Sequence, residues 1–213
     1  MKTLKIKATT LLLSAGVLFV AYNSKAQTGA VAIDASQVVS NFKFTDSEGT
    51  QQKEYSPRFT SAYSLGYRHK LDNGVIIRGA LGMRNAGATL IYDESNYSWN
   101  LQYMDIKVGA GYAYSLSKLD VYLTVSPYYA FLLKANQRIN NEDYDIKTSA
   151  AINKADYGVI FSPGVILNVN DFMSAYVEIN YLMGLANLET GETGQKSNNT
   201  AIMPTLGVAF KLK

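Results

Sequence analysis

The sequence predicts an all-β fold, an eight-stranded antiparallel up-and-down transmembrane β-barrel. Eight segments alternate between apolar residues and small or polar ones, which is the period of a β-strand with one apolar face. Long and tight connections alternate between these segments, as expected if neighbouring strands run up and down. The face opposite the apolar one is chiefly Gly, Ala, Ser and Thr, which suits the crowded lumen of a narrow barrel.

The eight segments are long for a soluble protein, in which strands have roughly five or six residues. The expected strands cover residues 30–44, 59–70, 75–85, 99–115, 119–133, 156–169, 173–186 and 199–212. Tight connections lie near residues 72, 117 and 171, and long ones at 45–58, 86–98, 134–155 and 187–198. In an up-and-down barrel, all tight turns and both termini then lie at one end, and all long loops at the other.

The first four segments differ in the clarity of their patterns. Residues 30–44 begin with Val31 and Ile33 opposite Asp34, but the alternation then blurs, so a short helix is the alternative there. The second, third and fourth segments alternate throughout, with aliphatic and aromatic residues on one face and small or charged residues on the other. These three are therefore predicted strands without an alternative.

The fifth to eighth segments also alternate, and the last is the clearest, since Leu206 and Val208 continue a strictly apolar row. Pro127, Pro163 and Pro204 fall inside the fifth, sixth and eighth segments. A closed barrel has no edge at which a missing N–H is harmless. Each proline is therefore expected at a bulge or near the long-loop end of its strand.

The phases of the apolar faces predict the lengths of the tight turns. Leu71 and Val75 share the apolar phase, as do Val169 and Met173, so three residues should lie between the members of each pair. In the first turn, Gly74 is expected in the left-handed conformation. The apolar phase switches between the fourth and fifth segments, which requires an even number of residues in that turn.

The direction of the apolar face separates two kinds of barrel. A soluble ligand-binding barrel of the lipocalin type places its apolar face inside, whereas a membrane barrel places it outside. A polar face in contact with water would be rich in long charged side chains, and here it is dominated by small residues. Several tyrosines also lie toward strand ends, as in the aromatic girdle of a membrane barrel. The sequence therefore favours the membrane barrel.

Residues 1–26 have the pattern of a cleaved secretory signal, and residues 27–213 form the barrel domain. Lysines precede a short apolar run at residues 11–21, which is shorter than the ~20 residues of a membrane-spanning helix. The small residues Ser24 and Ala26 suit cleavage before Gln27. Four of the 20 Lys and Arg residues and none of the 17 acids lie in this segment, so the remainder has a formal charge of −1. No basic footprint for nucleic acid remains.

The predicted lumen face includes ionisable side chains of both signs. These are Asp34, Arg68, Arg78, Arg84, Asp105, Lys107, Glu178 and Lys211. Unpaired buried charge is costly, so we expect pairs across the lumen. Antiparallel alignment from the tight turns brings Arg84 near Asp105 and Arg68 near Asp34. The network is interpreted as a structural plug, and an ion or proton path is the alternative.

The last segment carries a second pattern, in which a polar residue, a glycine and two apolar residues have fixed spacing: Thr205-x-Gly207-x-x-Phe210-x-Leu212. This pattern resembles the barrel-assembly signal of the porin-like outer-membrane β-barrel family of Gram-negative bacteria, although Lys213 follows it. The resemblance extends over the mature chain. It implies an outer-membrane location in contact with lipid, and biogenesis through periplasmic chaperones and the barrel-assembly machinery. It implies no activity, because that family is functionally heterogeneous.

The sequence offers little for catalysis, and we expect neither an enzyme nor a cofactor. There is no cysteine, which excludes disulfides, thiolate metal sites and thiol nucleophiles. A lipid-modifying enzyme would need a histidine near a serine and a carboxylate, and the single His69 has no nearby serine in sequence. Asp143 and Asp145 are interpreted as solvated acids, with a cation site as the alternative. A structural or surface-interaction protein is therefore favoured over a narrow channel.

Overall fold

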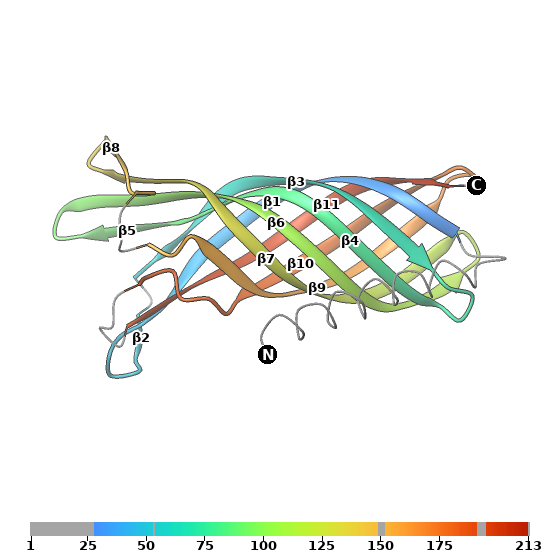
Figure 1. The fold of residues 1–213 in the computed structure, drawn as a ribbon, viewed down its shortest axis with the longest axis horizontal. Coiled ribbons are helices and arrows are strands. Elements are labelled where there is room, and N and C mark those ends of the chain that lie inside the picture. The colour runs from blue at the N-terminus through green and yellow to red at the C-terminus, as the bar shows by residue number, and fades with distance from the viewer. Residues whose placement is uncertain (1–27, 53, 149–151, 191–194, 213) are drawn as a thin grey trace, which may run out of the picture.

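The computed structural model describes residues 28–52, 54–148, 152–190 and 195–212, so the expected signal at 1–26 lies outside the described residues. The longer strands are β1 (Thr28–Thr45), β3 (Ser56–Lys70), β4 (Val75–Ala86), β6 (Ser95–Leu116), β7 (Leu119–Ile139), β9 (Ala155–Asn168), β10 (Met173–Gly184) and β11 (Lys196–Lys211). Three short strands extend them: β2 (Gln51–Gln52), β5 (Ala88–Tyr92) and β8 (Glu142–Asp145). The long strands form one tilted barrel (Figure 1).

The barrel is closed by pairing of the first strand with both the second long strand and the last. Ile33 of β1 lies opposite Leu65 of β3 on one side and Val208 of β11 on the other, and all these pairings are antiparallel. Each of the eight long strands therefore has two neighbours, and none presents an open edge. The predicted eight-stranded up-and-down barrel is confirmed. The helix considered for residues 30–44 is wrong, because this segment is the complete strand β1.

The tight turns have the predicted lengths. Leu71 N donates to Val75 O at 2.8 Å around a three-residue loop, and Gly74 has a positive φ of 88°. Val169 N likewise donates to Met173 O at 3.1 Å around the second three-residue loop. The turn between β6 and β7 has two residues, the even number that the phase switch requires. We call this end of the barrel, which also holds both ends of the described chain, the turn end.

The long connections differ from the expectation, because much of their length is strand. The predicted loop at 86–98 contains β5 and the start of β6, joined by Asp93 and Glu94, which both have positive φ. The predicted loop at 134–155 contains the end of β7 and all of β8, joined at Asn140 and Asn141, again with positive φ. Such two-residue turns are typical of hairpins. Hairpins therefore project from this end of the barrel, which we call the hairpin end (Figure 1).

A β-bulge in β7 explains why the sequence pattern ended too early there. Gln102 of β6 lies opposite Lys134, but its neighbour Tyr103 lies opposite Leu132, so Leu133 is an extra residue. The inward phase shifts by one position at this point, leaving Leu132 buried and Lys134 exposed. Beyond the bulge the strand continues with the opposite phase, which a single alternating pattern does not detect.

The three strand prolines lie at neither of the expected places. Each points outward in mid-strand and interrupts one ladder without a bulge. Pro127 falls in a gap of the β6–β7 ladder, Pro163 in one of β9–β10, and Pro204 in one of β1–β11. The register is the same on both sides of each gap. A missing N–H affects one neighbour only, so each strand keeps its other ladder intact.

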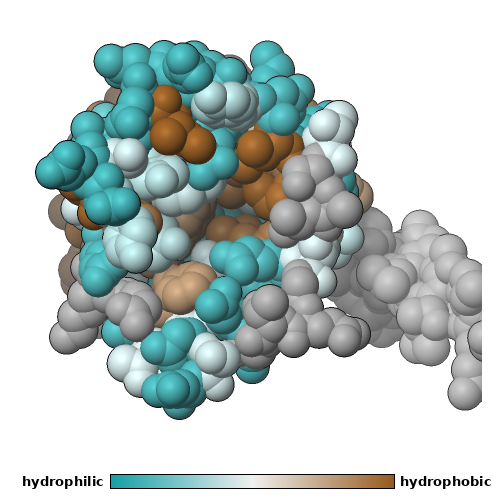
Figure 2. All heavy atoms as spheres, turned by 90° about the vertical axis from the view of Figure 1, so that its left-hand side faces the viewer, coloured by the Kyte–Doolittle hydropathy of each residue, from teal (hydrophilic) through white to brown (hydrophobic). Residues whose placement is uncertain are grey.

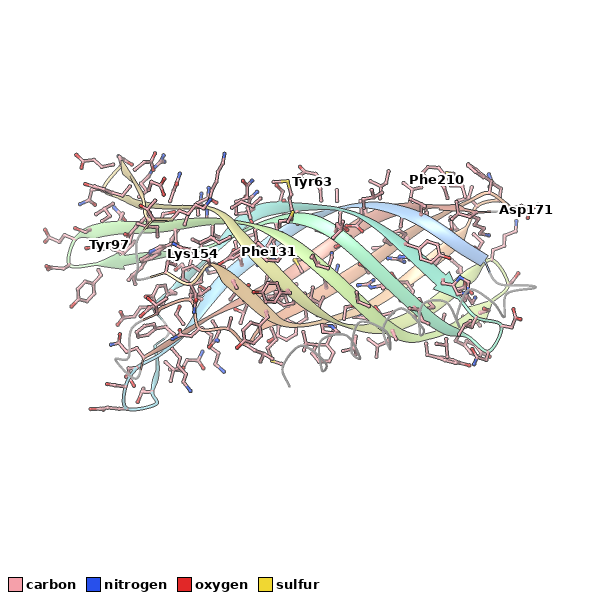
Figure 3. All side chains as sticks on the ribbon, in the orientation of Figure 1. Tyr63, Tyr97, Phe131, Lys154, Asp171 and Phe210 are labelled. Carbon is pink, nitrogen blue, oxygen red and sulfur yellow. The ribbon has the colours of Figure 1, made fainter. Side chains whose placement is uncertain are left out.

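The apolar face points outward, so the soluble-barrel alternative is wrong. Figure 3 shows Tyr63, Phe131 and Phe210 on the outside of the barrel wall, and large apolar side chains are exposed along every long strand. No helix among the described residues has the length and apolarity that a bilayer span requires. The outward apolar surface belongs to the strands, as in a transmembrane barrel.

Leu123 lies near the middle of the outward row of β7, between Leu119 and Phe131, and is 52% exposed. Leu123→Arg places a charge in the hydrocarbon and should destabilise the folded barrel by about 2–4 kcal/mol. Ile91→Arg is the matched control, because Ile91 is 76% exposed on β5 at the hairpin end. Urea titration in lipid vesicles measures both. Equal stabilities would contradict the placement of Leu123 in the bilayer.

Candidate functional site in the barrel lumen

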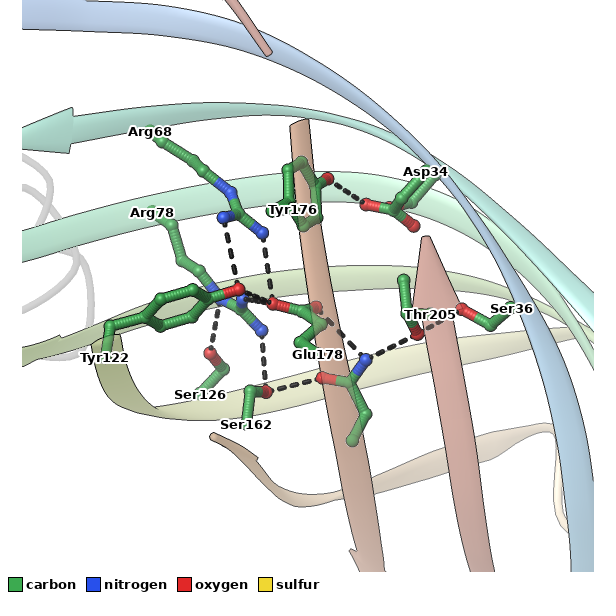
Figure 4. Close-up of polar contacts among 12 residues, drawn as sticks. Asp34, Ser36, Arg68, Arg78, Tyr122, Ser126, Ser162, Tyr176, Glu178 and Thr205 are labelled. Atoms are coloured by element: carbon green, nitrogen blue, oxygen red, sulfur yellow. Dashed lines mark hydrogen bonds and ion pairs between the residues drawn. The ribbon is translucent and has the colours of Figure 1, made fainter. Parts of the chain in front are cut away.

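The first polar cluster of the lumen is built around the buried carboxylate of Glu178 on β10, and we call it the Glu178 cluster. Arg68 and Arg78, on neighbouring strands β3 and β4, place guanidinium nitrogens 3.1 and 2.8 Å from its Oε2. Tyr122 OH donates to the same oxygen at 2.5 Å, and Asn180 Nδ2 donates to Oε1 at 3.1 Å (Figure 4). Two cations share one anion, so this cluster has an excess positive charge.

Asp34 joins this cluster through a tyrosine and not through an arginine. Tyr176 OH donates to Asp34 Oδ2 at 3.0 Å, while the guanidinium carbon of Arg68 lies 3.6 Å from the centre of the Tyr176 ring. The predicted contact between Arg68 and Asp34 is therefore wrong. In the β1–β3 register Arg68 lies opposite Ala30, and Asp34 lies opposite Ser64, whose hydroxyl donates to it at 2.7 Å.

The second polar cluster surrounds Arg84, whose side chain is 1% exposed, and we call it the Arg84 cluster. Arg84 Nε lies 3.0 Å from Asp105 Oδ2, and its Nη2 lies 3.1 Å from Asp156 Oδ2. Tyr128 OH and Asn199 Nδ2 donate to the same Asp156 oxygen at 3.1 and 2.8 Å. One cation faces two anions, so the excess charge here is negative, opposite to that of the Glu178 cluster.

Some of the predicted lumen residues form ion pairs and others do not. It brings Arg84 and Asp105 together, and gathers Arg68, Arg78 and Glu178 around one another. Lys107 is half-buried beside cavities near both clusters and forms no ion pair among the described residues. Lys211 lies at the turn end, with its Nζ 3.4 Å from Asn170 O.

Three charged lumen residues were missing from the sequence prediction. Asp156 stands at the boundary of the expected loop 134–155, where the alternating pattern has only begun, although its phase is inward. Lys70 and Asp120 form an ion pair of 2.7 Å near the turn end. Both occupy the inward phase of their expected strands, so the same parity argument would have found them.

Three lumen tyrosines depend on glycines directly opposite them on the next strand. Tyr122 lies opposite Gly164 and Tyr176 opposite Gly207, and a Cβ added to either glycine would lie 2.6 or 2.2 Å from the ring. Tyr128 has the same relation to Gly158, at 2.9 Å. Each ring therefore crosses a bare backbone to reach the carboxylate it binds. Gly207 of the predicted assembly signal thus also gives space to Tyr176.

The other residues of that signal divide between the two faces of β11. Thr205 is buried in the lumen and accepts a hydrogen bond from Asn180 at 2.8 Å. The Phe210 ring packs against Phe172 of the turn at 5.6 Å, and Leu212 is exposed on the outer surface. Leu212 N also donates to Gly29 O at 2.8 Å, which joins the two ends of the described chain.

Large apolar side chains fill much of the hairpin half of the lumen, which differs from the expected small-residue lining. Leu101, Leu132, Ile160 and Leu182 are buried there with Phe42 in one hydrophobic cluster. Each lies within an expected strand on its inward phase, so the alternation placed these large apolar residues in the lumen although small residues were expected there. The Glu178 cluster lies nearer the turn end, whereas the Arg84 cluster lies among these apolar side chains, since Arg84 is opposite Tyr103 and Asp156 is opposite Ala130.

Cavities in the described lumen follow the same division. A cavity of about 460 Å³ opens at the turn end and is lined by residues that include Arg68, Lys70 and Tyr176. Beyond the Arg68 side chain, the cavities beside the Glu178 and Arg84 clusters measure about 20 and 10 Å³. The second could hold about one water molecule. The wide mouth therefore narrows sharply at the Glu178 cluster.

The residues considered for catalysis or metal binding have other contacts. His69 Nδ1 lies 3.2 Å from Tyr67 OH, and the two rings are stacked. Asp143 pairs with Arg138 at 2.6 Å on the exposed β7–β8 hairpin, and this hydrogen bond lowers the pKa of the carboxyl. Asp145 accepts a hydrogen bond from Lys147 N. The described residues contain no group of three or more potential metal ligands.

This geometry agrees with one known family. The family described as "Outer membrane protein beta-barrel domain" matches residues 25–189, which is more than half of the chain. The chain therefore belongs to this family, and it is a multi-pass β-barrel of the outer membrane, in contact with its lipid. No match was found among curated proteins.

Comparison with solved structures found similar chains at low sequence identity. Neisserial surface protein A is 14% identical with a TM-score of 0.51, and the match covers 88% of this chain and all of that one. The attachment invasion locus protein Ail of Yersinia pestis is 12% identical with a TM-score of 0.48, covering 87% and 99%. OprG of Pseudomonas aeruginosa is 8% identical with a TM-score of 0.48, covering 87% and 97%.

Arg84→Met removes the cation that Asp105 and Asp156 share. Two buried carboxylates then lack a counter-charge, and the barrel should lose about 3–5 kcal/mol of unfolding free energy. Arg138→Met is the matched control, because the Arg138–Asp143 pair is exposed to water and should leave stability unchanged. Urea titration in vesicles compares the two. Equal losses would contradict the buried ion-pair assignment.

Gly207→Ala should destabilise the barrel by about 1–3 kcal/mol, since the new methyl group overlaps the Tyr176 ring. Gly79→Ala is the control, because the nearest atom to its added Cβ is 3.7 Å away, an ordinary contact. Folding yield and urea stability in vesicles measure both. A Gly207 variant as stable as the Gly79 variant would refute the close packing of Tyr176 on β11.

Proposed function

We propose that this protein is a non-conducting outer-membrane barrel that presents its hairpins at the cell surface, with a structural or surface-interaction role. The observation that carries the proposal is the filling of the lumen. An apolar cluster and the Arg84 cluster together fill its hairpin half, and the Glu178 cluster crosses it nearer the turn end. These groups leave cavities of only about 20 and 10 Å³ beside the ionic clusters.

The charge balance of the lumen supports a plug over a selective pore. Arg68, Arg78 and Glu178 leave one positive charge, and Arg84 with Asp105 and Asp156 leaves one negative charge. Asp34 and Lys107, which line the cavities between the clusters, carry one negative and one positive charge. The formal charge of all eight residues together is therefore zero. Ion-selective pores present an excess of one sign to the passing ion. A balanced set, of which six charges are paired within the two clusters, is better suited to holding strands together across the lumen.

Biogenesis completes the proposal. The 1–26 segment would direct export and be removed, and periplasmic chaperones would carry the unfolded barrel domain. The assembly machinery would read Thr205, Gly207, Phe210 and Leu212 at the end of the last strand. The hairpin end would then face outward, because the turn end holds both ends of the described chain and the short connections.

A narrow channel for small solutes or ions is the second candidate. One observation favours it: the cavity of about 460 Å³ at the turn end reaches inward as far as Arg68. Movement of the Arg68 and Arg78 side chains away from Glu178 would lengthen this cavity. A lipid-modifying enzyme is a distant third, since Tyr67 stacks on the only histidine of the sequence.

Planar-bilayer recording tests the closed lumen. Protein shown to be folded by circular dichroism should produce no steady unit conductance. Arg84→Ser and Asp105→Ser probe the lumen, and Arg138→Ser on the exposed hairpin is the matched control. A steady wild-type conductance that changes with either lumen variant, and not with Arg138→Ser, would contradict the closed lumen and support the channel.

A further inference from the structure

A separate cavity lies at the hairpin end of the lumen, next to the apolar cluster. It measures about 90 Å³, enough for several water molecules or one small organic group. Phe42, Tyr55 and Trp99 form an aromatic wall, Leu101 and Leu188 contribute apolar surface, and Glu189 supplies a carboxylate. Figure 2 looks onto this end and shows hydrophobic residues within a hollow that is bordered by hydrophilic ones.

The aromatic wall is assembled from three different parts of the chain. Phe42 lies on β1, Tyr55 precedes β3 and Trp99 lies on β6, and their ring centres are 5.8–6.1 Å apart. Backbone contacts hold two of them: Asn41 Nδ2 donates to Tyr55 O at 3.1 Å, and Arg58 donates to Trp99 O at 2.9 Å. The rings are therefore positioned before any ligand arrives. Aromatic faces attract cations through their negative quadrupole.

The described wall of this cavity carries only negative charge. Glu189 is held there by a backbone bridge to Ile152 and is half-buried. Its carboxylate has no hydrogen bond or ion pair among the described residues, and the described cavity wall contains no Lys or Arg. Burial raises the pKa of Tyr55, and the negative charges of Glu189 and Glu54 add to this rise.

We propose that this cavity binds a small organic cation, an ammonium group with apolar substituents. The apolar substituents would contact Leu101 and Leu188, and the charge would face the aromatic wall and Glu189. A neutral apolar ligand would desolvate Glu189 without compensating its charge, which is unfavourable. A bare metal ion would find one carboxylate and apolar surface, which is a poor ligand set.

Trp99 makes this proposal directly measurable, because it is the only tryptophan in the sequence. Choline is titrated into the folded protein while Trp99 emission is recorded, alongside dimethylbutanol, its neutral isostere with carbon in place of nitrogen. Choline should cause a saturable change, and the alcohol should not. Equal responses to both, or no saturable response to choline, would overturn the proposal. This comparison uses the wild-type protein and depends on no variant.

Glu189→Gln removes the charge and should weaken choline binding about tenfold or more. Glu94→Gln is the matched control, since Glu94 lies in the exposed turn at the tip of the β5–β6 hairpin and outside the cavity wall. Unchanged affinity in Glu189→Gln would also overturn the proposal. The cavity lies at the other end of the barrel from the wide turn-end mouth, so this titration and the conductance recording can fail independently.

Discussion

The structure depends on one constraint, which is that a closed eight-stranded barrel has an interior only wide enough for side chains. Closure between β1 and β11 satisfies every strand edge, but it also requires the enclosed side chains to fill the space and to satisfy one another. The barrel meets this requirement with apolar packing in its hairpin half and with two ionic clusters, one within that half and one nearer the turn end. The outer surface needs only to be apolar, because it contacts lipid.

The ionic clusters also connect strands that are not neighbours. Glu178 on β10 is bound by side chains from β3, β4 and β7, and Asp156 on β9 is bound from β4, β7 and β11. Backbone ladders join only adjacent strands, so these contacts act as struts across the bore. The glycines opposite Tyr122 and Tyr176 give these rings the space to reach Glu178 and Asp34, respectively.

Parity along the chain predicted the barrel, the outward face and the three tight turns, because each depends only on local alternation. It failed where the alternation is broken. The extra residue Leu133 shifts the phase of β7, so the last residues of that strand were assigned to a loop. The two-residue turns at 93–94 and 140–141 likewise interrupt the alternation, so short strands were assigned to loops. Alignment from a tight turn placed Arg84 beside Asp105 correctly. It wrongly paired Arg68 with Asp34, because a long connection joins β1 to β3 and their register places Arg68 opposite Ala30.

The three outward prolines have a consequence before the barrel exists. Three of the eight ladders contain a gap at a proline, in strands β7, β9 and β11. An unfolded outer-membrane chain exposes long amphipathic strands to water, where a second chain could add along any continuous edge. A residue with no N–H cannot template a continuous ladder. These strands therefore carry built-in protection against chain-to-chain aggregation, and the folded barrel tolerates it because each interrupted strand is fully paired on its other side.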